Sequence, residues 1–289
     1  MNFNYIKKIR KFIRFNIYWY IKYAPLKILS FFIFRFKLKN LKYKIKYKQK
    51  IPTTVYQTWV SNKFNKNHYI QLIKFREINP QLSFKFYDQK QMDMYMKKNW
   101  QKHKIFKIYN QVNFGPLQTD IFRYCILYDM GGYYFDIDKM CLAPLTSLHP
   151  SNASALITHE PYYHKKEKNL KVKRILKSSN YNLCQWGFGF QKKHIILIML
   201  INEICEKFEN YNNYRFKTFI KGATKFTGPA LFTDIIRNFI KDKKDKNLFF
   251  CRTNFNGFGV FRIKDSHWRY VLKRPAWTYK NVRLTKNIS

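Results

Sequence analysis

Acidic residues are scarce in this chain. Sixteen Asp and Glu stand against 56 Lys and Arg among 289 residues, which gives a formal net charge of +40. Residues 1–50 hold 15 basic residues and no acid, and the first acid is Glu77. Such charge indicates non-specific attraction to anionic partners but specifies neither fold nor activity. The chain shows no nucleic-acid-binding motif, so we expect no specific nucleic-acid partner.

Cysteine pairs and long apolar runs are also missing. The five cysteines are odd in number and form no Cys-x-x-Cys pair, which argues against a disulfide framework or a zinc site and indicates reduced thiols. The longest charge-free runs of the basic N-terminal part, 15–21 and 28–34, have seven residues each. A spanning helix needs roughly 20 apolar residues, and a signal peptide needs a longer apolar core than these runs offer.

Residues 1–48 interleave basic residues with aromatic and aliphatic ones, and Pro25 interrupts the stretch. This composition favours an interfacial membrane anchor, because each base near an anionic surface contributes about 1 kcal/mol. Two alternatives remain open: a helical hairpin packed on the rest of the chain, and a nucleic-acid-binding arm. We expect a cytoplasmic protein that is peripheral on the inner face of the cytoplasmic membrane, with a separate folded domain over 49–289.

The chain after residue 51 alternates between strand and helix patterns. Strands are expected over 53–59 and 82–87, with an amphipathic helix between them that ends before Pro80. This order implies a parallel pair with a right-handed crossover. A second helix over 117–130 is bounded by Pro116 and Gly131. The pattern predicts an α/β fold with a ligand site at the carboxyl ends of its strands.

The few acids gather around that second helix. Asp136 and Asp138 follow it, and in a strand residues i and i+2 point to one face. Two converging carboxylates repel each other unless a cation joins them, and Mg²⁺ or Mn²⁺ suits such oxygen ligands. On the helix itself, Asp120 and Arg123 are neighbours at i and i+3. They are either a weak surface ion pair or part of the same site.

The string over 118–138 resembles the sugar-binding Asp-x-Asp region of glycosyltransferase family 32, which includes capsular and lipopolysaccharide transferases and the fungal Golgi initiating α-1,6-mannosyltransferase. The similarity continues at 51–59, 184–186 and 227–234. Two departures stand out. Tyr56 occupies the place of a family histidine, and the family's C-terminal His and Gly-Ser-Trp motif appears only as His267 and a distant Trp277.

The resemblance implies a GT-A type fold over 49–289, with a mainly parallel central sheet flanked by helices. To this the composition adds a basic, aromatic, helical N-terminal extension over 1–48. It implies that Asp136 and Asp138 hold Mn²⁺ or Mg²⁺, which stabilises the charge on a departing diphosphate. The remaining implied roles are donor-sugar binding by Asp120 and Arg123, nucleotide binding by Gln57, Trp59 and Trp277, a catalytic amide near the anomeric carbon in Gln185, and a further metal contact from His267.

The expected function is therefore metal-dependent, retaining transfer of a hexose from GDP-mannose or a UDP-hexose to a surface polysaccharide or lipid-linked oligosaccharide, as in capsule or lipopolysaccharide biosynthesis. A toxin-like protein glucosyltransferase would share the core motifs. A basic adaptor without chemistry, for membrane or nucleic acid, would leave the acids unexplained. A haloacid-dehalogenase-type phosphatase is disfavoured, because Met140 stands where that class has Thr or Val.

Overall fold

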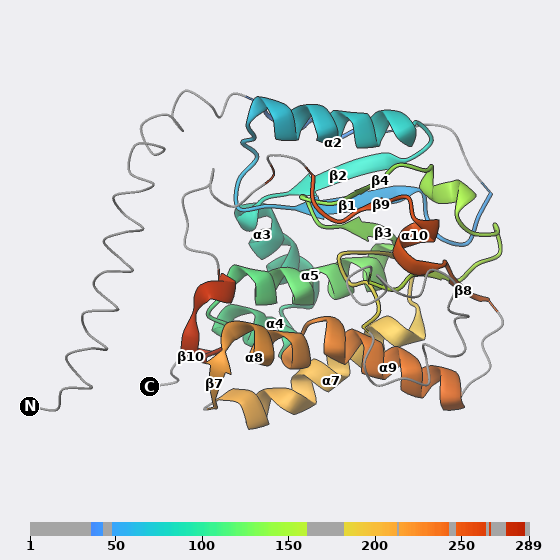
Figure 1. The fold of residues 1–289 in the computed structure, drawn as a ribbon. Helices are drawn as coiled ribbons and strands as arrows, with labels where there is room; N and C mark the ends of the chain where they lie inside the picture. Colours follow the sequence, from blue (N-terminus) through green and yellow to red (C-terminus); the bar gives the residue numbers. More distant parts are fainter. Residues whose placement is uncertain are drawn as a thin grey trace, which may run out of the picture.

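A six-stranded sheet forms the centre of the molecule (Figure 1). The computed structural model describes residues 36–42, 48–160, 182–212, 214–242, 247–263, 266 and 276–286. The strand order is β2-β1-β3-β6-β5-β8, and every neighbouring pair is parallel except the two that include β6. The strands are β1 (Thr54–Thr58), β2 (Ser83–Tyr87), β3 (Gly132–Phe135), β5 (Ala155–Ile157), β6 (Gly187–Phe190) and β8 (Leu248–Phe250).

Helices cover both faces of this sheet (Figure 1). Helix α2 (Lys66–Ile78) lies on one face, where its Leu72 and Phe75 pack against Val55 of β1. The opposite face carries α3 (Gln89–Trp100), α4 (Lys104–Gln111), α5 (Gly115–Met130), α7 (Ile195–Asn212), α8 (Phe219–Phe226) and α9 (Pro229–Asp242). The expected α/β fold, with a mainly parallel sheet flanked by helices, is confirmed.

Short elements complete the described part. Strand β7 (Arg215–Thr218) pairs with β10 (Lys280–Arg283), and β4 (Met140–Cys141) pairs with β9 (Gly259–Val260), both antiparallel. The remaining elements are α10 (Thr253–Asn256) and the 3₁₀ turns η1 (Leu145–Ser147) and η4 (Ala276–Thr278). All five cysteines are buried and free, as their spacing predicted.

The predicted strand-helix-strand unit is present: β1 and β2 are parallel and aligned from Thr54–Ser83 to Thr58–Tyr87. The predicted second helix is α5, and it ends at Gly131, whose φ is +64°. Gly132 also has a positive φ, and a Cβ there would collide with the carbonyl oxygen of Thr54. The double glycine therefore lets the chain turn directly from α5 into a strand that pairs with β1.

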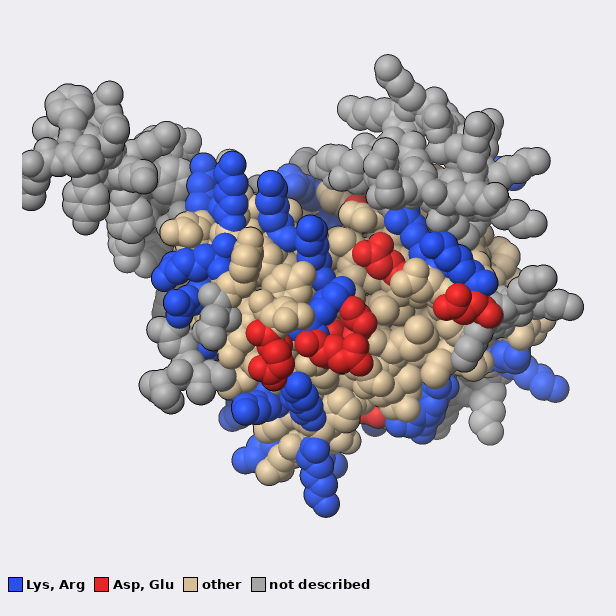
Figure 2. Space-filling view, turned by 90° about the horizontal axis from the view of Figure 1, so that it is seen from below, with Lys and Arg blue, Asp and Glu red and all other residues tan. Residues whose placement is uncertain are grey.

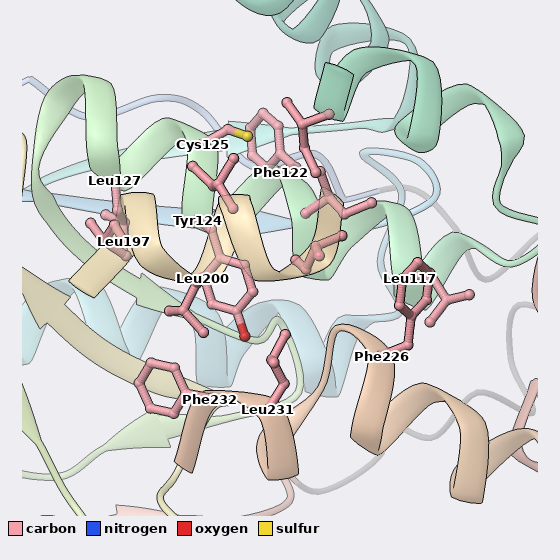
Figure 3. Packing of buried hydrophobic residues seen from close by; sticks show 14 of the residues in the cluster. Leu117, Phe122, Tyr124, Cys125, Leu127, Leu197, Leu200, Phe226, Leu231 and Phe232 are labelled. Carbon is pink, nitrogen blue, oxygen red and sulfur yellow. The ribbon is translucent and has the colours of Figure 1, made fainter. Parts of the chain in front are cut away.

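Helix α5 is buried on nearly all sides. Its side chains from 117 to 127 pack against Leu197 and Leu200 of α7, Phe226 of α8, and Phe232 of α9 (Figure 3). A surface helix would carry a polar stripe along one face. Because α5 has neighbours all round, its charged residues Asp120 and Arg123 lie in the interior.

Residues 36–42 belong to the fold. Leu38 is buried in the core, and Leu41 exchanges two backbone hydrogen bonds of 3.0 Å with Phe84. These residues of the segment 1–48 thus pack on the sheet through isolated bridges, which is not the helical hairpin that was the packed alternative. The expected helical extension in 1–35 lies outside the described residues, so its membrane role and the boundary at 48 remain predictions.

The charge excess is visible on the surface: seen from below, Lys and Arg side chains spread widely, while acids form a few small groups (Figure 2). In the part of the chain that the structure describes, no helix is both long and apolar enough to cross a membrane.

Candidate functional site

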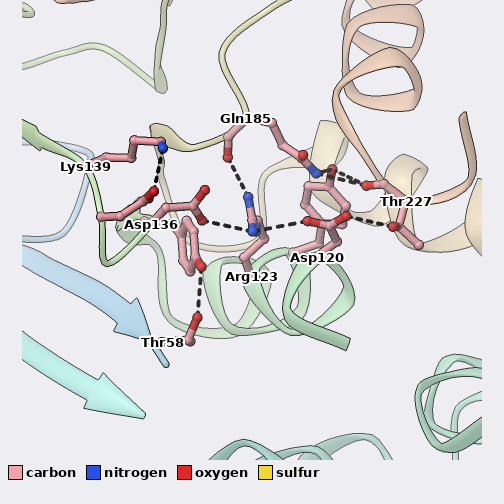
Figure 4. A network of polar contacts seen from close by, with 10 residues as sticks. Thr58, Asp120, Arg123, Asp136, Lys139, Gln185 and Thr227 are labelled. Atoms are coloured by element: carbon pink, nitrogen blue, oxygen red, sulfur yellow. Dashed lines mark hydrogen bonds and ion pairs between the residues drawn. The ribbon is translucent and has the colours of Figure 1, made fainter. Parts of the chain in front are cut away.

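The acids singled out in the sequence meet at the carboxyl ends of β1 and β3. Asp136 follows β3 directly, and Thr58 is the last residue of β1. The Thr58 hydroxyl lies 2.9 Å from the hydroxyl of Tyr134, which ties the two strand ends together. Asp120 and Arg123 reach the same place from the middle of α5 (Figure 4). The site therefore lies at the edge of the sheet that the fold class predicts.

Arg123 is the centre of a buried polar network (Figure 4). One terminal guanidinium nitrogen, Nη2, lies 3.0 Å from Asp136 Oδ1 and 3.1 Å from Asp120 Oδ1. The other, Nη1, donates to the carbonyl oxygen of Gln185 at 2.7 Å, and the guanidinium lies 4.3 Å from the ring centroid of Tyr134. Its side chain is only 6% exposed. The interpretation of Asp120 and Arg123 as a surface ion pair is therefore wrong.

Asp120 is held from a second direction by the joint between α8 and α9. Its Oδ2 accepts a hydrogen bond of 2.7 Å from the hydroxyl of Thr227. The carbonyl oxygen of Thr227 accepts in turn from the Tyr124 hydroxyl at 2.9 Å and from the Gln185 side-chain amide at 2.9 Å. The same Gln185 amide also donates to the Tyr124 oxygen at 2.6 Å. Segments more than a hundred residues apart thus fix one carboxylate.

Burial dominates the electrostatics of this network. It raises the pKa of Asp120 to about 7, against the opposing effects of Arg123 and of the Thr227 hydroxyl. Burial also raises the pKa of Asp136; Arg123 opposes this rise and Asp138 adds to it. Burial alone would lower the pKa of Arg123, but Asp136, Tyr134 and Asp120 raise it above its ordinary value. Arg123 therefore stays charged, and the carboxylates around it gain from any further cation or hydrogen-bond donor.

The sequence suggested that one strand orients both aspartates of the Asp-x-Asp pair, but in the structure both aspartates follow the end of the strand. Strand β3 ends at Phe135, and the chain turns, with the Lys139 amide donating to the Asp136 carbonyl oxygen at 3.0 Å. Asp138 lies 2.9 Å from the ammonium of Lys139 instead of sharing the Arg123 network. His68 of α2 fixes the turn, with its Nε2 2.8 Å from the carbonyl oxygen of Ile137.

The carboxylates of Asp136 and Asp138 fit a cation that keeps water or substrate oxygens among its ligands. Asp136 and Asp138 have side chains 30% and 31% exposed, so a ligand can reach both. Mg²⁺ is usually bound through one or two carboxylates, with water and substrate phosphates as its other ligands. Among the described residues, no group of three or more His, Cys, Asp or Glu is placed to hold a metal ion. His267 lies outside the described residues, and its role remains a prediction.

Two of the predicted nucleotide-binding residues, Gln57 and Trp59, lie at the same edge of the sheet. Gln57 is in β1 and only 1% exposed, and neither polar atom of its side chain has a partner among the described residues. Such a buried amide is costly without a partner, which fits a role in binding a ligand. Trp59 follows β1 and packs against the core. Trp277 belongs to η4. The assignments of Gln57, Trp59 and Trp277 stay predictions.

Sequence reasoning did not single out several members of this site. Tyr124 is at i+4 from Asp120, so helical spacing could have placed it on the same face. Thr227 lies within the 227–234 segment but was given no role. Lys139 directly follows the Asp-x-Asp pair. Glu160 is a further acid, with a pKa that burial raises to about 7 and that Lys139 lowers in part. No sequence signal marks Glu160.

Comparisons with known proteins agree with this geometry. Residues 50–155 match the glycosyltransferase sugar-binding region containing a DXD motif. The initiation-specific α-1,6-mannosyltransferase of Candida albicans is 24% identical over 231 residues, covering 71% of this chain and 57% of that protein. Its namesake in Schizosaccharomyces pombe is 25% identical over 143 residues, covering 47% and 35%. The chain thus spans little more than half the length of these relatives at most.

Among solved structures, the PaToxG glycosyltransferase superposes on this chain with a TM-score of 0.49 and is 15% identical to it; the match covers 81% of each chain. The matched region 50–155 contains Asp120, Arg123, Asp136 and Asp138, the residues at the centre of the site. Over residues 50–155 the chain is therefore similar to the glycosyltransferases whose sugar-binding region contains a DXD motif.

Proposed function

We propose that the protein transfers a hexose from a nucleotide-diphosphate sugar to a saccharide acceptor with the help of Mn²⁺ or Mg²⁺. The observation that carries this proposal is Arg123, a buried cation that joins Asp120 and Asp136 at the carboxyl ends of β1 and β3. Burying one cation between two carboxylates contributes little to stability relative to apolar packing. The arrangement instead offers a rigid set of hydrogen-bonding groups at an edge where ligands bind.

Each residue has a distinct part in this proposal. Asp136 is the more open of the two carboxylates that Arg123 holds, so it accepts hydrogen bonds from the donor sugar or ribose hydroxyls. Asp120 and Arg123 fix the position of Asp136 and line the sugar side of the site. Asp138, with Asp136, holds the cation. When bound, the cation supplies Lewis-acid stabilisation of the departing diphosphate.

The proposed transfer retains the anomeric configuration. An acceptor oxygen bonds to the anomeric carbon on the face from which the diphosphate leaves, and the acceptor proton passes to a diphosphate oxygen. Gln185 is proposed to lie near the reacting carbon, because its carbonyl oxygen and side-chain amide are both held by the network. The two fungal relatives are named as mannosyltransferases, which favours GDP-mannose over a UDP-hexose as the donor.

The proposed acceptor is a surface polysaccharide or a lipid-linked oligosaccharide at the inner face of the cytoplasmic membrane. The support for this location is the basic, aromatic composition of 1–48, which suits an anionic surface. An acceptor anchored in the membrane would then be presented close to the enzyme.

A donor-hydrolysis screen tests the proposal. The full chain is incubated with UDP- and GDP-sugars, with Mn²⁺ or with EDTA, and release of the nucleoside diphosphate is measured. We expect turnover of one donor class that EDTA abolishes. Asp136→Asn should reduce it by about 100-fold or more, as expected for the loss of a preorganised electrostatic contact. Asp234→Asn is the matched control, since Asp234 is exposed on α9 and outside the network. No turnover of any donor would contradict the proposal.

A further inference from the structure

Lys139 places a cation inside the acidic site. Its ammonium lies 2.9 Å from Asp138 Oδ2, and its side chain is only 10% exposed. The same ammonium lies 4.4 Å from the ring centroid of Phe261, a cation–π contact on its apolar side. Lysine side chains are rarely buried unless paired. Lys139 is therefore held in one place between an aromatic ring and a carboxylate that the proposed function assigns to metal binding.

The charges around Lys139 do not balance without a further cation. Its charge lowers the pKa of both Asp136 and Glu160, which places it within electrostatic reach of two acids besides Asp138. When all four carboxylates are ionised, they outnumber the two cations and leave a formal charge of −2, which one divalent ion neutralises; burial raises the pKa of Asp120 and Glu160 to about 7, so a divalent ion would favour this ionised state. These groups are Asp120, Asp136, Asp138, Glu160, Arg123 and Lys139.

We propose that Lys139 is the built-in counter-ion of the Asp-x-Asp pair: its ammonium occupies Asp138 in the free protein, competes with the divalent cation for that carboxylate, and turns to the donor diphosphate when the cation binds. This inference rests on the proposed function for the identity of the anionic ligand. A lysine ammonium has three donors on a stem with four rotatable bonds, so it can exchange the Asp138 carboxylate for another anion within reach of that stem.

The competition can be measured without any turnover. Mn²⁺ is titrated into the full-length protein and free Mn²⁺ is followed by electron paramagnetic resonance, for the wild type and for Lys139→Met. Methionine keeps most of the side-chain length and loses the charge. We expect the Mn²⁺ dissociation constant to fall by about tenfold or more, because a unit charge a few ångströms from the ion is removed. Lys139→Arg keeps the charge and should leave the affinity near that of the wild type.

The chain contains a matched control. The Lys193 ammonium lies 3.2 Å from Asp129 and 4.1 Å from the ring centroid of Tyr128, the same kind of arrangement. Lys193 is 53% exposed and pairs with an acid outside the Asp-x-Asp site. Lys193→Met should therefore leave Mn²⁺ binding unchanged. If Lys139→Met binds Mn²⁺ no more tightly than Lys193→Met does, Lys139 does not compete with the cation and the inference is overturned.

A second measurement tests the diphosphate contact. Binding of GDP and UDP is measured by calorimetry at saturating Mn²⁺, where the proposal has Lys139 released from Asp138. For the nucleotide that the wild type binds more tightly, we expect Lys139→Met to raise the dissociation constant by about tenfold, because one charge-assisted hydrogen bond is lost. Lys139→Arg keeps the charge and should retain most of the affinity. Unchanged binding in Lys139→Met overturns this part. Failure of the proposed function has a different signature, namely no donor turnover by the wild type, whatever Lys139→Met does to Mn²⁺ affinity.

Discussion

Replacing Arg123 with methionine tests whether the network at the strand ends is as tightly coupled as its geometry implies. Methionine is similar in length but carries no charge and no donors. The substitution leaves Asp120 and Asp136 without their shared cation and the carbonyl oxygen of Gln185 without its donor. We expect the free energy of unfolding to fall by about 3–5 kcal/mol, the usual cost of removing one partner of a buried ion pair.

The sequence alone suggests a much smaller effect. An exposed pair at i and i+3 contributes about 0.2–0.5 kcal/mol, so its loss would scarcely change stability. The difference arises because α5 is buried on nearly all sides, which removes the solvent that would otherwise stabilise the two carboxylates. Donor turnover by Arg123→Met should also fall by at least about tenfold, the equivalent of 1.36 kcal/mol in the barrier.

The measurement is urea unfolding followed by circular dichroism at neutral pH in EDTA, with the slope checked for each variant. Arg76→Met is the matched control. Arg76 is equally buried, but its described contacts are the Leu72 carbonyl oxygen and the Phe84 ring and include no carboxylate. Its loss should change stability by about 1 kcal/mol or less.

Adding Asp120→Asn to Arg123→Met removes the buried carboxyl that has lost its cation and should recover about 1–3 kcal/mol, the desolvation cost of a buried polar group. This recovery would identify electrostatics, not packing, as the source of the loss. A loss below about 1 kcal/mol in Arg123→Met alone would refute the reasoning, because it is far below the cost of unpairing buried charges.

Three further predictions concern the cation, pH and the N-terminus. Asp138→Asn should lower Mn²⁺-supported donor turnover by about 100-fold or more with an unchanged circular dichroism spectrum, and an equally active variant would remove the metal role. Burial lowers the pKa of His68 to about 4, so stability should decline below pH 6.5 and be about 2 kcal/mol lower at pH 5. In urea unfolding, the free energy of unfolding of His68→Gln should fall by about 2 kcal/mol less than that of the wild type between neutral pH and pH 5. An equal fall would contradict the low pKa of His68. Deleting residues 1–35, which spares the packed 36–42, should abolish salt-sensitive binding to anionic vesicles in a sedimentation assay; retained binding would place the membrane contact elsewhere.

The local patterns of the chain predicted the framework of the site. β-Branched and aromatic residues mark β1, alternation marks β2, and Pro116 and Gly131 bound α5 as expected. These predictions hold because propensity, capping and periodicity act over a few neighbouring residues. They also place Asp136 at the end of a strand, whereas the pairing of that strand with β1 came from the structure.

The surroundings of α5 were decided by the tertiary structure. The i and i+3 spacing of Asp120 and Arg123 is the same on a surface helix and on a buried one, so the sequence left both readings open. Packing of α7, α8 and α9 around α5 resolves the choice, since it excludes water from both charges. Thr227 reaches Asp120 from a position more than a hundred residues later, and no local pattern encodes that contact.

The Asp-x-Asp turn shows the same division. The sequence by itself determined that two acids lie close together after a double glycine, and carboxylates are the ligand type that a divalent cation prefers. Only the tertiary structure determined that the strand ends at Phe135, that His68 holds the turn from α2, and that Lys139 lies against Asp138 and Phe261. The physical reason is that side-chain chemistry is fixed by residue type, whereas burial and charge pairing depend on what distant segments bring to the same place.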